Sequence, residues 1–357
     1  MFDKTFELPL AKTYVAHWGL VEGVREIVQN ALDSDSPFVY EFDREDDGTF
    51  SLVLRSEFSE LGPSTLLLGT TSKAEATDKI GSFGEGYKIA MLVLTRLQYR
   101  ISIWNGDKVW TPFFRWSNRF ESELLCVRED KAPAKHTGLT FTVSGLDEDD
   151  CEAIRGICLK MQRHIGEVRE TSMGRILIER PGKLYVGSLF VNETKTVCGY
   201  DIDPEHVSLE RDRRTVDTWS LNALARAMWY ETEDFDTISK MIVAKAPEMQ
   251  GCRYDAPAMV KQAVYRWFQE NYEGQLIAAT EEELRNAIEK GMTKYVHVGD
   301  DIGAMVKSVT PDAVQVKKMT PTEQLEKWWA DAKYMKAADR ERAFHKLLEQ
   351  SRRWRHS

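Results

Sequence analysis

The chain has 357 residues and a formal net charge of −9, with 42% apolar and 29% charged residues. This length suffices for two or three domains with cores of their own, and the composition is that of a globular protein. The acidic balance excludes a surface that is basic throughout, although a local basic patch that meets nucleic acid remains compatible with it.

No apolar run reaches the roughly 20 residues of a membrane-spanning helix, and the first residues, MFDKTFELPLAK, lack the pattern of a signal peptide. The five cysteines are scattered and have no CxxC spacing. They predict neither a disulfide framework nor a zinc site. We therefore expect a cytoplasmic protein with reduced thiols and no membrane association.

The first informative element is a helix predicted over residues 24–33, VREIVQNALD. Its apolar residues recur at offsets of three, four and seven and form one buried stripe, while Glu26, Asn30 and Asp33 line up on another face. A carboxylate one turn before an amide suits ATP hydrolysis: Glu26 would activate a water, and the side-chain oxygen of Asn30 would help to hold Mg²⁺. The alternative is that this face is only the solvated side of an amphipathic helix.

Two strands follow at 38–44 and 49–55, with a turn at Asp46, Asp47 and Gly48. Residues 66–91 then predict a short helix, a loop rich in small and polar residues, and a glycine-rich turn before another helix. Glycines in this turn let the backbone approach phosphates, and amide groups at the start of the next helix can donate to them. An ordinary turn is the alternative for such a spacing alone.

In this order, the two pieces resemble motifs of the GHKL ATPases, which include gyrase B subunits, MutL, heat-shock chaperones, histidine kinases and Microrchidia ATPases. The stretch EIVQNALD at 26–33 resembles the N-box, and GSFGEGYK at 81–88 resembles the glycine-rich lid motif. The segment LGTTSK at 68–73 is similar to Microrchidia and gyrase-like lids. The resemblance, nearest to Microrchidia-like or MutL-like domains, implies ATP and Mg²⁺ as ligands.

The resemblance also implies an α+β fold that begins with a Bergerat-type ATP-binding sandwich, a mixed sheet with helices on one face, over residues 1–147. We expect a smaller, transducer-like α+β domain at 148–255. A small α/β module with a long C-terminal helix completes the chain at 256–357.

By resemblance, Glu26 is the general base and Asn30 the Mg²⁺ ligand. Further nucleotide contacts are implied at Asp33, Ser56, Lys73, Gly81, Ser82, Phe83, Gly84, Glu85, Gly86, Tyr87, Lys88 and Thr140. For Lys73 and Lys88 the alternative is a lysine that is merely solvated. Thr137 is the other candidate for the contact given to Thr140. For either residue, the alternative is a threonine that only favours a strand.

One segment departs from the family pattern. SEFSELGP at 56–63 stands where the family has an aspartate and glycines for the adenine, so Ser56 occupies the aspartate position. A serine hydroxyl can bond a base directly or through water, and Glu57 offers a substitute. Selectivity for adenine over guanine therefore stays open.

Strands are predicted at 96–106, 108–116 and 136–145, with a hairpin turn at Asn105, Gly106 and Asp107. Beyond them we expect a helix at 151–166, a hairpin around Pro181 and Gly182, and a helix at 218–243. A strand–helix–strand unit at 274–299 has Thr280 as its helix cap and Gly291 as its stop.

Two basic segments carry open alternatives. In the first segment, one alternative is that a single arginine contacts the γ-phosphate, and the other is that all three arginines form an internal salt-bridge cluster. The three are Arg211, Arg213 and Arg214. The second segment is the tail SRRWRHS, which follows a long charged helix predicted at 322–352. One alternative is that it contacts nucleic acid; the other is that it is disordered or pairs with an acidic surface.

The leading functional prediction is Mg²⁺-dependent ATP hydrolysis that couples lid closure to conformational change or to engagement of a protein partner or a second copy of the chain. The alternative is a nucleotide-gated protein-binding or DNA-binding module that does not hydrolyse. A structural protein with a dead pocket is a third possibility.

Overall fold

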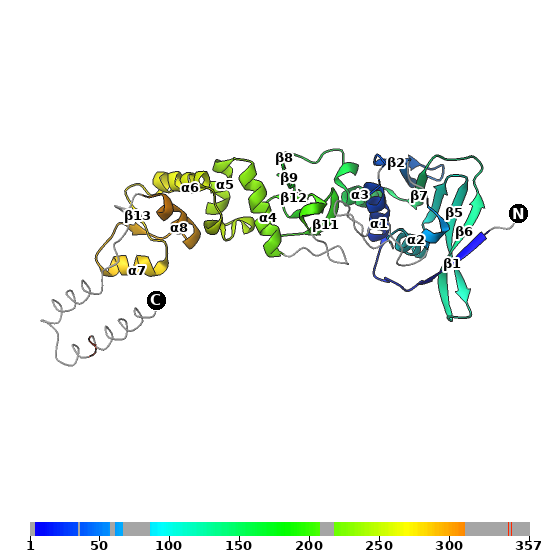
Figure 1. Ribbon diagram of the computed structural model, residues 1–357, viewed down its shortest axis with the longest axis horizontal. Coiled ribbons are helices and arrows are strands. Elements are labelled where there is room, and N and C mark those ends of the chain that lie inside the picture. Colours follow the sequence, from blue (N-terminus) through cyan, green and yellow to red (C-terminus); the bar gives the residue numbers. More distant parts are fainter. Residues whose placement is uncertain are drawn as a thin grey trace. The chain divides into compact units, whose positions relative to one another are not determined.

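The computed structural model describes residues 4–34, 36–57, 61–66, 86–207, 218–310, 342 and 344. The chain divides into two compact units, Met1–Ala263 and Val264–Ser357. Helices and antiparallel strands are mixed along it, which confirms the α+β class (Figure 1). The boundary predicted near residue 147 falls inside the first unit. Among the described helices, none is both long enough and apolar enough to cross a membrane.

A seven-stranded sheet forms the N-terminal part of the first unit, in the order β1-β6-β5-β4-β7-β3-β2. All six neighbouring pairs are antiparallel, so the expectation of a mixed sheet was wrong here. Tight hairpins join β2 to β3, β4 to β5 and β5 to β6, and such connections make strands antiparallel. The strands are β1 (Lys4–Ala11), β2 (Val39–Arg44), β3 (Phe50–Ser56), β4 (Arg100–Asn105), β5 (Lys108–Ser117), β6 (Ser122–Lys131) and β7 (Leu139–Leu146).

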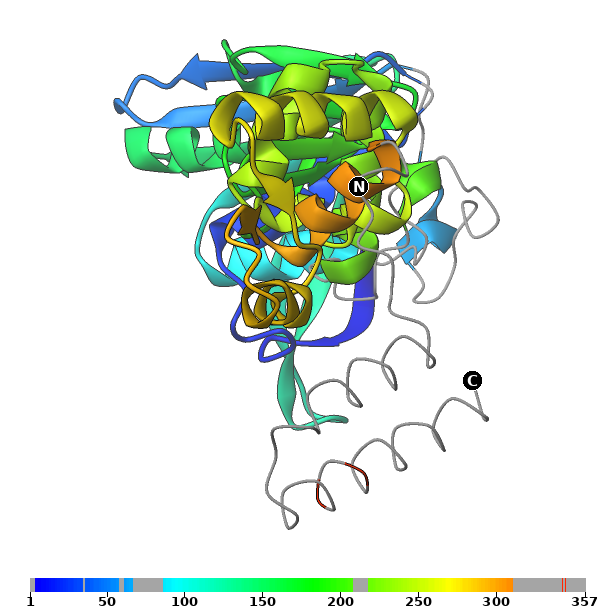
Figure 2. The ribbon, with the colours of Figure 1, turned by 90° about the vertical axis from the view of Figure 1, so that its left-hand side faces the viewer.

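The hairpin of β5 and β6 extends beyond the end of β4, the strand next to β5. Both strands have 10 residues, whereas β4 has 6 and pairs with β5 only as far as Trp110. Figure 2 shows this ribbon projecting from the sheet, and its end carries the exposed rings of Trp116 and Phe120.

Helices α1 (Leu20–Leu32), α2 (Gly86–Arg96) and α3 (Glu148–Ile157) pack against this sheet through one continuous core. Alternate residues of the strands, such as Leu52 and Leu54 in β3, face these helices because successive side chains point to opposite faces of a sheet. Figure 1 shows α1 and α2 on the same side of the sheet.

Two glycines show how closely α1 and α2 pack. A Cβ added at Gly23 would lie 3.0 Å from the side chain of Leu94, near the end of α2. A Cβ at Gly86, the first residue of α2, would meet residues of the last turns of α1. The start of each helix therefore lies against the end of the other, and the pair is antiparallel.

Arg96 fastens the end of α2 to the loop before α1. Its guanidinium donates to four backbone carbonyl oxygens, those of Lys12, Tyr14, Val15 and Trp18, at 2.9 to 3.2 Å. Val15 has a φ of 45°, a left-handed conformation that a β-branched residue adopts only where its surroundings impose it. The path of residues 12–18 is thus fixed by one side chain of α2.

A five-stranded sheet follows, in the order β11-β10-β12-β9-β8, with β10 and β12 parallel. Its strands are β8 (Val168–Thr171), β9 (Gly174–Leu177), β10 (Lys183–Val186), β11 (Leu189–Glu193) and β12 (Gly199–Ile202). The predicted hairpin around Pro181 and Gly182 is wrong, because β12 lies between β9 and β10. The hairpin is instead β10–β11, through Gly187 and Ser188, which both have positive φ.

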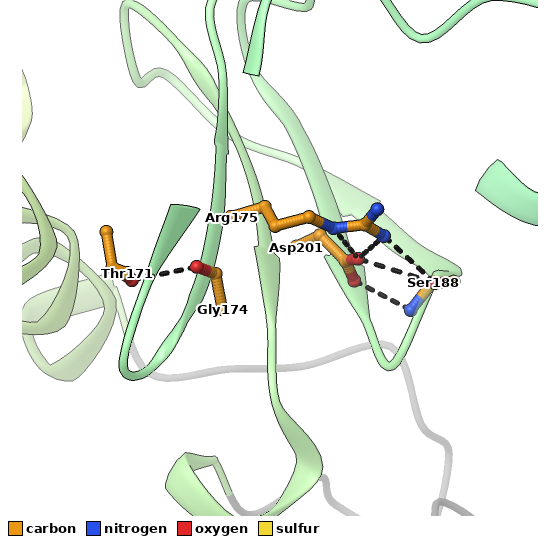
Figure 3. A network of polar contacts seen from close by, with 5 residues as sticks. All are labelled: Thr171, Gly174, Arg175, Ser188 and Asp201. Carbon is orange, nitrogen blue, oxygen red and sulfur yellow. Dashed lines mark hydrogen bonds and ion pairs between the residues drawn. The ribbon is translucent and has the colours of Figure 1, made fainter. Parts of the chain in front are cut away.

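Figure 3 shows how this turn is held. The carboxylate of Asp201 accepts a bond from the backbone N–H of Ser188 at 2.7 Å and from Nε of Arg175 at 3.1 Å. Arg175 also donates to the Ser188 hydroxyl at 3.1 Å. Asp201 is buried, so these bonds replace the water that its charge would otherwise require.

Helices α4 (Thr218–Glu231) and α5 (Phe235–Val243) follow this sheet in the first unit. We predicted one helix here, but Glu233 has a φ of 54° and Asp234 caps a new helix by accepting from the N–H of Thr237. Short 3-10 turns occur at Pro63–Leu66, Leu159–Met161, Pro204–His206, Pro247–Met249 and Cys252–Tyr254.

Helix α6 (Ala258–Asn271) runs across the boundary into the second unit. There, β13 (Leu276–Ile277) precedes α7 (Glu281–Glu289) in the chain and β14 (Tyr295–Val296) follows it, and the two strands pair in parallel. This confirms the strand–helix–strand prediction. The hydroxyl of Thr280 caps α7, and Gly291 follows it with a φ of 75°. A further helix, α8 (Asp300–Val309), was not predicted.

Candidate functional site

The polar face of α1 holds the two central candidates. Glu26 is only 2% exposed, and its helix is fixed by the buried side chains of Val24, Ile27 and Val28. Nδ2 of Asn30 donates to the backbone oxygen of Glu26 at 2.7 Å. This bond uses a donor of the amide and leaves its acceptor atom, Oδ1, out of the contact. Such an oxygen suits a magnesium ligand.

Gly86 brings the start of α2 directly onto these two residues. A Cβ at this position would lie 2.5 Å from Oε2 of Glu26 and 3.2 Å from Nδ2 of Asn30. The first of these distances is shorter than any normal contact, so only glycine fits here without a shift of the carboxylate. The residue that ends the glycine-rich stretch therefore lies beside both the predicted base and the predicted metal ligand.

Tyr87 and Lys88 are anchors of the same region. Nζ of Lys88 is fully buried and donates to the carbonyl oxygen of Thr65 at 2.9 Å, and the Tyr87 hydroxyl donates to the same oxygen. Burial raises the pKa of Tyr87 to about 12. These bonds tie Pro63–Leu66 to the first turn of α2, so the two ends of the intervening segment are held together.

A row of side chains crosses the end of the sheet on the face that α1 and α2 cover. Ser56 in β3 and Asn105 in β4 both pair with Leu139 in β7, and all three are 7 to 8% exposed. Asn105 donates to the backbone oxygen of Leu61 at 2.6 Å and accepts from its N–H at 3.1 Å. Asn105 thus holds Leu61 at the end of β4.

Sequence reasoning missed both Asn105 and Gly138 as contributors. Asn105 was assigned only to a turn, yet its two-residue spacing from Ile103 and Ile101 already places it on the buried face of β4. Gly138 has a φ of 71°, and a Cβ there would lie 2.4 Å from the carbonyl oxygens of Ser56 and Glu57. Only glycine permits this approach of β7 to the end of β3.

The remaining predicted contacts divide into three groups. Asp33 is buried, and it lies directly after α1, one turn beyond Asn30. Thr140 pairs with Arg55 and Trp104, on the face of the sheet opposite to Leu139 and Phe141, so the structure does not bring it to Glu26. That register argues against the predicted nucleotide contact of Thr140. Outside the described residues lie Lys73, Gly81, Ser82, Phe83, Gly84, Glu85, Arg211, Arg213, Arg214 and the tail SRRWRHS.

Within the described part of the chain, no three His, Cys, Asp or Glu side chains gather as a ready-made metal site. A cation beside Asn30 would accordingly take most of its ligands from phosphate oxygens and water, as Mg²⁺ commonly does in nucleotide sites.

No protein-family model matches the chain. An uncharacterized protein of Mycoplasma pneumoniae is similar to it, with 21% identity over 218 residues, which cover 57% of this chain and 88% of that protein. Likeness at this level does not assign an activity.

Proposed function

We propose that this protein binds and hydrolyses ATP with Mg²⁺, in the manner of a GHKL-type ATPase with a Bergerat-type nucleotide site. One observation carries the proposal: the backbone of Gly86 lies against Glu26 and Asn30. A carboxylate, an amide side chain and the end of a glycine-rich segment thus meet at one place.

The division of labour follows from these positions. Glu26 accepts a proton from the attacking water, which requires that the carboxylate be ionised and held still. Asn30 supplies an oxygen to Mg²⁺, whose charge would offset that of the phosphates. Backbone N–H groups at the start of α2 donate to phosphate oxygens, as helix N-termini do. Closure of the segment before Gly86 couples the nucleotide to a partner or a second copy of the chain.

Phosphate release by the full chain in the presence of Mg²⁺ tests the proposal. Glu26→Gln should abolish turnover but retain ATP binding, because the amide keeps the shape of the carboxylate and loses its basicity. Glu41→Gln is the matched control, since Glu41 lies in the edge strand β2 in an exposed ion pair with Arg55. Equal rates in the wild type and Glu26→Gln would refute hydrolysis at this site.

A second candidate is a nucleotide-gated protein-binding or DNA-binding module that does not hydrolyse. The departure at SEFSELGP favours it, because Ser56 stands in place of an aspartate that would read adenine. Titration with ATP and GTP, monitored by the thermal unfolding midpoint, separates the cases. Stabilisation by nucleotide without phosphate release supports the gated module, and stabilisation by neither nucleotide contradicts both.

A further inference from the structure

A cleft lies on the side of α1 away from Glu26 and Asn30. It has a volume of about 890 Å³ and is lined by parts of α1, α3 and the five-stranded sheet. Its residues from α1 are Val21 and Arg25, which lie roughly 140° around the helix from Glu26 and Asn30 at 3.6 residues per turn. The volume is in the range of small-molecule sites. This cleft is therefore separate from the site at Gly86.

The lining of the cleft is basic, although the chain as a whole is acidic. Its cationic residues are Arg25, Arg155, Arg163, Arg180 and Lys183, with His164 beside them, and its acidic residues are Glu148 and Glu152. Five Lys or Arg thus line the cleft against two Glu, whereas the whole chain has a net charge of −9. Two of the five are ion-paired, Arg155 with Glu152 and Lys183 with Glu193. A concave surface of one sign concentrates the field and attracts ligands of the opposite charge.

Two of the guanidinium groups have no carboxylate partner among the residues that the structure describes. Arg180 donates to the carbonyl oxygens of His164 at 2.8 Å and Ile165 at 3.0 Å and to the Tyr185 hydroxyl at 3.4 Å, all neutral acceptors. Arg163 is exposed and has no hydrogen bond or ion pair with any residue that the structure describes. Arg180 is held rigidly by its own chain, and Arg163 is available for a ligand.

Aromatic rings complete the lining. Tyr185 and Phe190 meet edge to face with centroids 5.5 Å apart, and Nζ of Lys183 lies 5.4 Å from the centroid of Phe190. Phe190 is half-buried, so part of its ring faces the cleft. Guanidinium groups without a carboxylate partner, beside a partly exposed aromatic ring, suit a ligand that carries both a phosphate and a planar ring.

We propose that this cleft binds a phosphate-bearing nucleotide unit, either a free mononucleotide or one residue of a single strand. Guanidinium forks match the geometry of phosphate oxygens, and aromatic side chains accept bases by stacking. The site takes its phosphate without Mg²⁺, because its own side chains supply the positive charge.

The test uses the full chain in EDTA, with two probes: an end-labelled oligothymidylate followed by fluorescence anisotropy, and thymidine monophosphate followed by calorimetry. Arg163→Glu should weaken binding about tenfold or more, because it replaces a charge-assisted bond by repulsion. Arg169→Glu is the matched control, since Arg169 is an exposed arginine of β8 that pairs with Glu167 outside the cleft. Its affinity should stay within about twofold of the wild type.

The two probes distinguish the sources of the phosphate. Arg163-dependent binding of the oligonucleotide identifies a strand, and Arg163-dependent binding of the mononucleotide alone identifies a small ligand. Equal affinity of the wild type and Arg163→Glu for both probes would overturn the proposal, as would citrate bound as tightly as the mononucleotide. Gly86→Ala, which should weaken ATP binding, should keep the binding in this cleft, so failure of one site is distinguishable from failure of the other.

Discussion

Among the described residues of the first unit, two glutamates are buried, and they are buried in different ways. Glu248 is fully buried and accepts bonds from the N–H groups of Val197 and Cys198 and from the Tyr200 hydroxyl, at 2.9 to 3.4 Å. Glu26 is 2% exposed, but it lies against the backbone of Gly86, at the end of a glycine-rich segment.

This difference separates a structural carboxylate from a candidate catalytic one. Glu248 joins Pro247–Met249 to the five-stranded sheet, and Trp229 donates to the same Tyr200 hydroxyl at 3.0 Å, so the network is closed within the protein. Burial and the nearby Glu248 raise the pKa of Tyr200 well above its usual value, which keeps its proton available for this bond. Burial alone therefore does not identify a reactive carboxylate. The groups that surround it decide whether its role is structural or catalytic.

The largest effects on turnover and stability are expected from substitutions of the two glutamates. Glu26→Gln should lower phosphate release by about a hundredfold or more, the usual contribution of a general base, with little change in stability. Glu248→Gln should leave turnover per folded molecule unchanged and lower the free energy of unfolding by about 1 to 3 kcal/mol, because the amide would put an N–H group against other donors. Phosphate release and denaturant unfolding of both variants measure this. If the two variants behave alike, the distinction between the glutamates is wrong.

Gly86→Ala sharpens the comparison at the site. Its Cβ would displace the Glu26 carboxylate, so ATP affinity should fall about tenfold or more, which corresponds to only about 1.4 kcal/mol. Glu41→Gln, in the exposed edge strand β2, is the control and should leave the affinity for ATP within about twofold of the wild type. Calorimetric titration of ATP into both variants gives the affinities. Unchanged affinity in Gly86→Ala would show that ATP does not depend on this contact.

Asn105→Ala tests the support of the site rather than its chemistry. Loss of both bonds to Leu61 should lower the free energy of unfolding by about 1 to 3 kcal/mol. Asn118→Ala, at an exposed position in the turn between β5 and β6, should change it by less than about 0.5 kcal/mol. Chemical denaturation compares the two variants. A similar small effect of both would mean that Asn105 does not hold Leu61.

The last prediction concerns the pH and not a substitution. Burial raises the pKa of the Cys158 and Cys198 thiols from 9.0 to about 11 and that of Tyr87 from 10.0 to about 12. The unfolded chain loses these protons at lower pH than the folded one, so the stability they confer is present below pH 9.0 and is lost as the pH rises through about 11 to 12. Unfolding midpoints measured across this range check the direction. A midpoint that rises between these limits would contradict it.

Local patterns predicted the local parts of this fold. The polar and apolar faces of α1, the hairpins at Gly48 and Gly106, and the cap of α7 at Thr280 all follow from residues close together in sequence. The strands β1 and β6 were missed, because charged residues interrupt their alternation and only pairing with each other and with β5 stabilises them.

Contacts between parts of the chain that are distant in sequence could not be predicted from local sequence patterns. Pro181 and Gly182 have the chemistry of a hairpin turn, yet β12, from later in the chain, pairs between β9 and β10. At the site, the spacing of Glu26 and Asn30 was visible in the sequence, whereas the approach of Gly86 to them depends on the packing of two helices. Thr140 was assigned without knowledge of the register, which decides its face.

The four carbonyl bonds of Arg96 have a mechanical consequence. Helix α2 has 11 residues and is therefore about 16 Å long; Gly86 is at one end and Arg96 at the other. A helix of this length behaves as a stiff rod, so an axial shift that begins at Gly86 would pull residues 12–18 with it. Those residues lead directly from the edge strand β1, and a disturbance at the phosphate end would thereby be felt at the rim of the sheet.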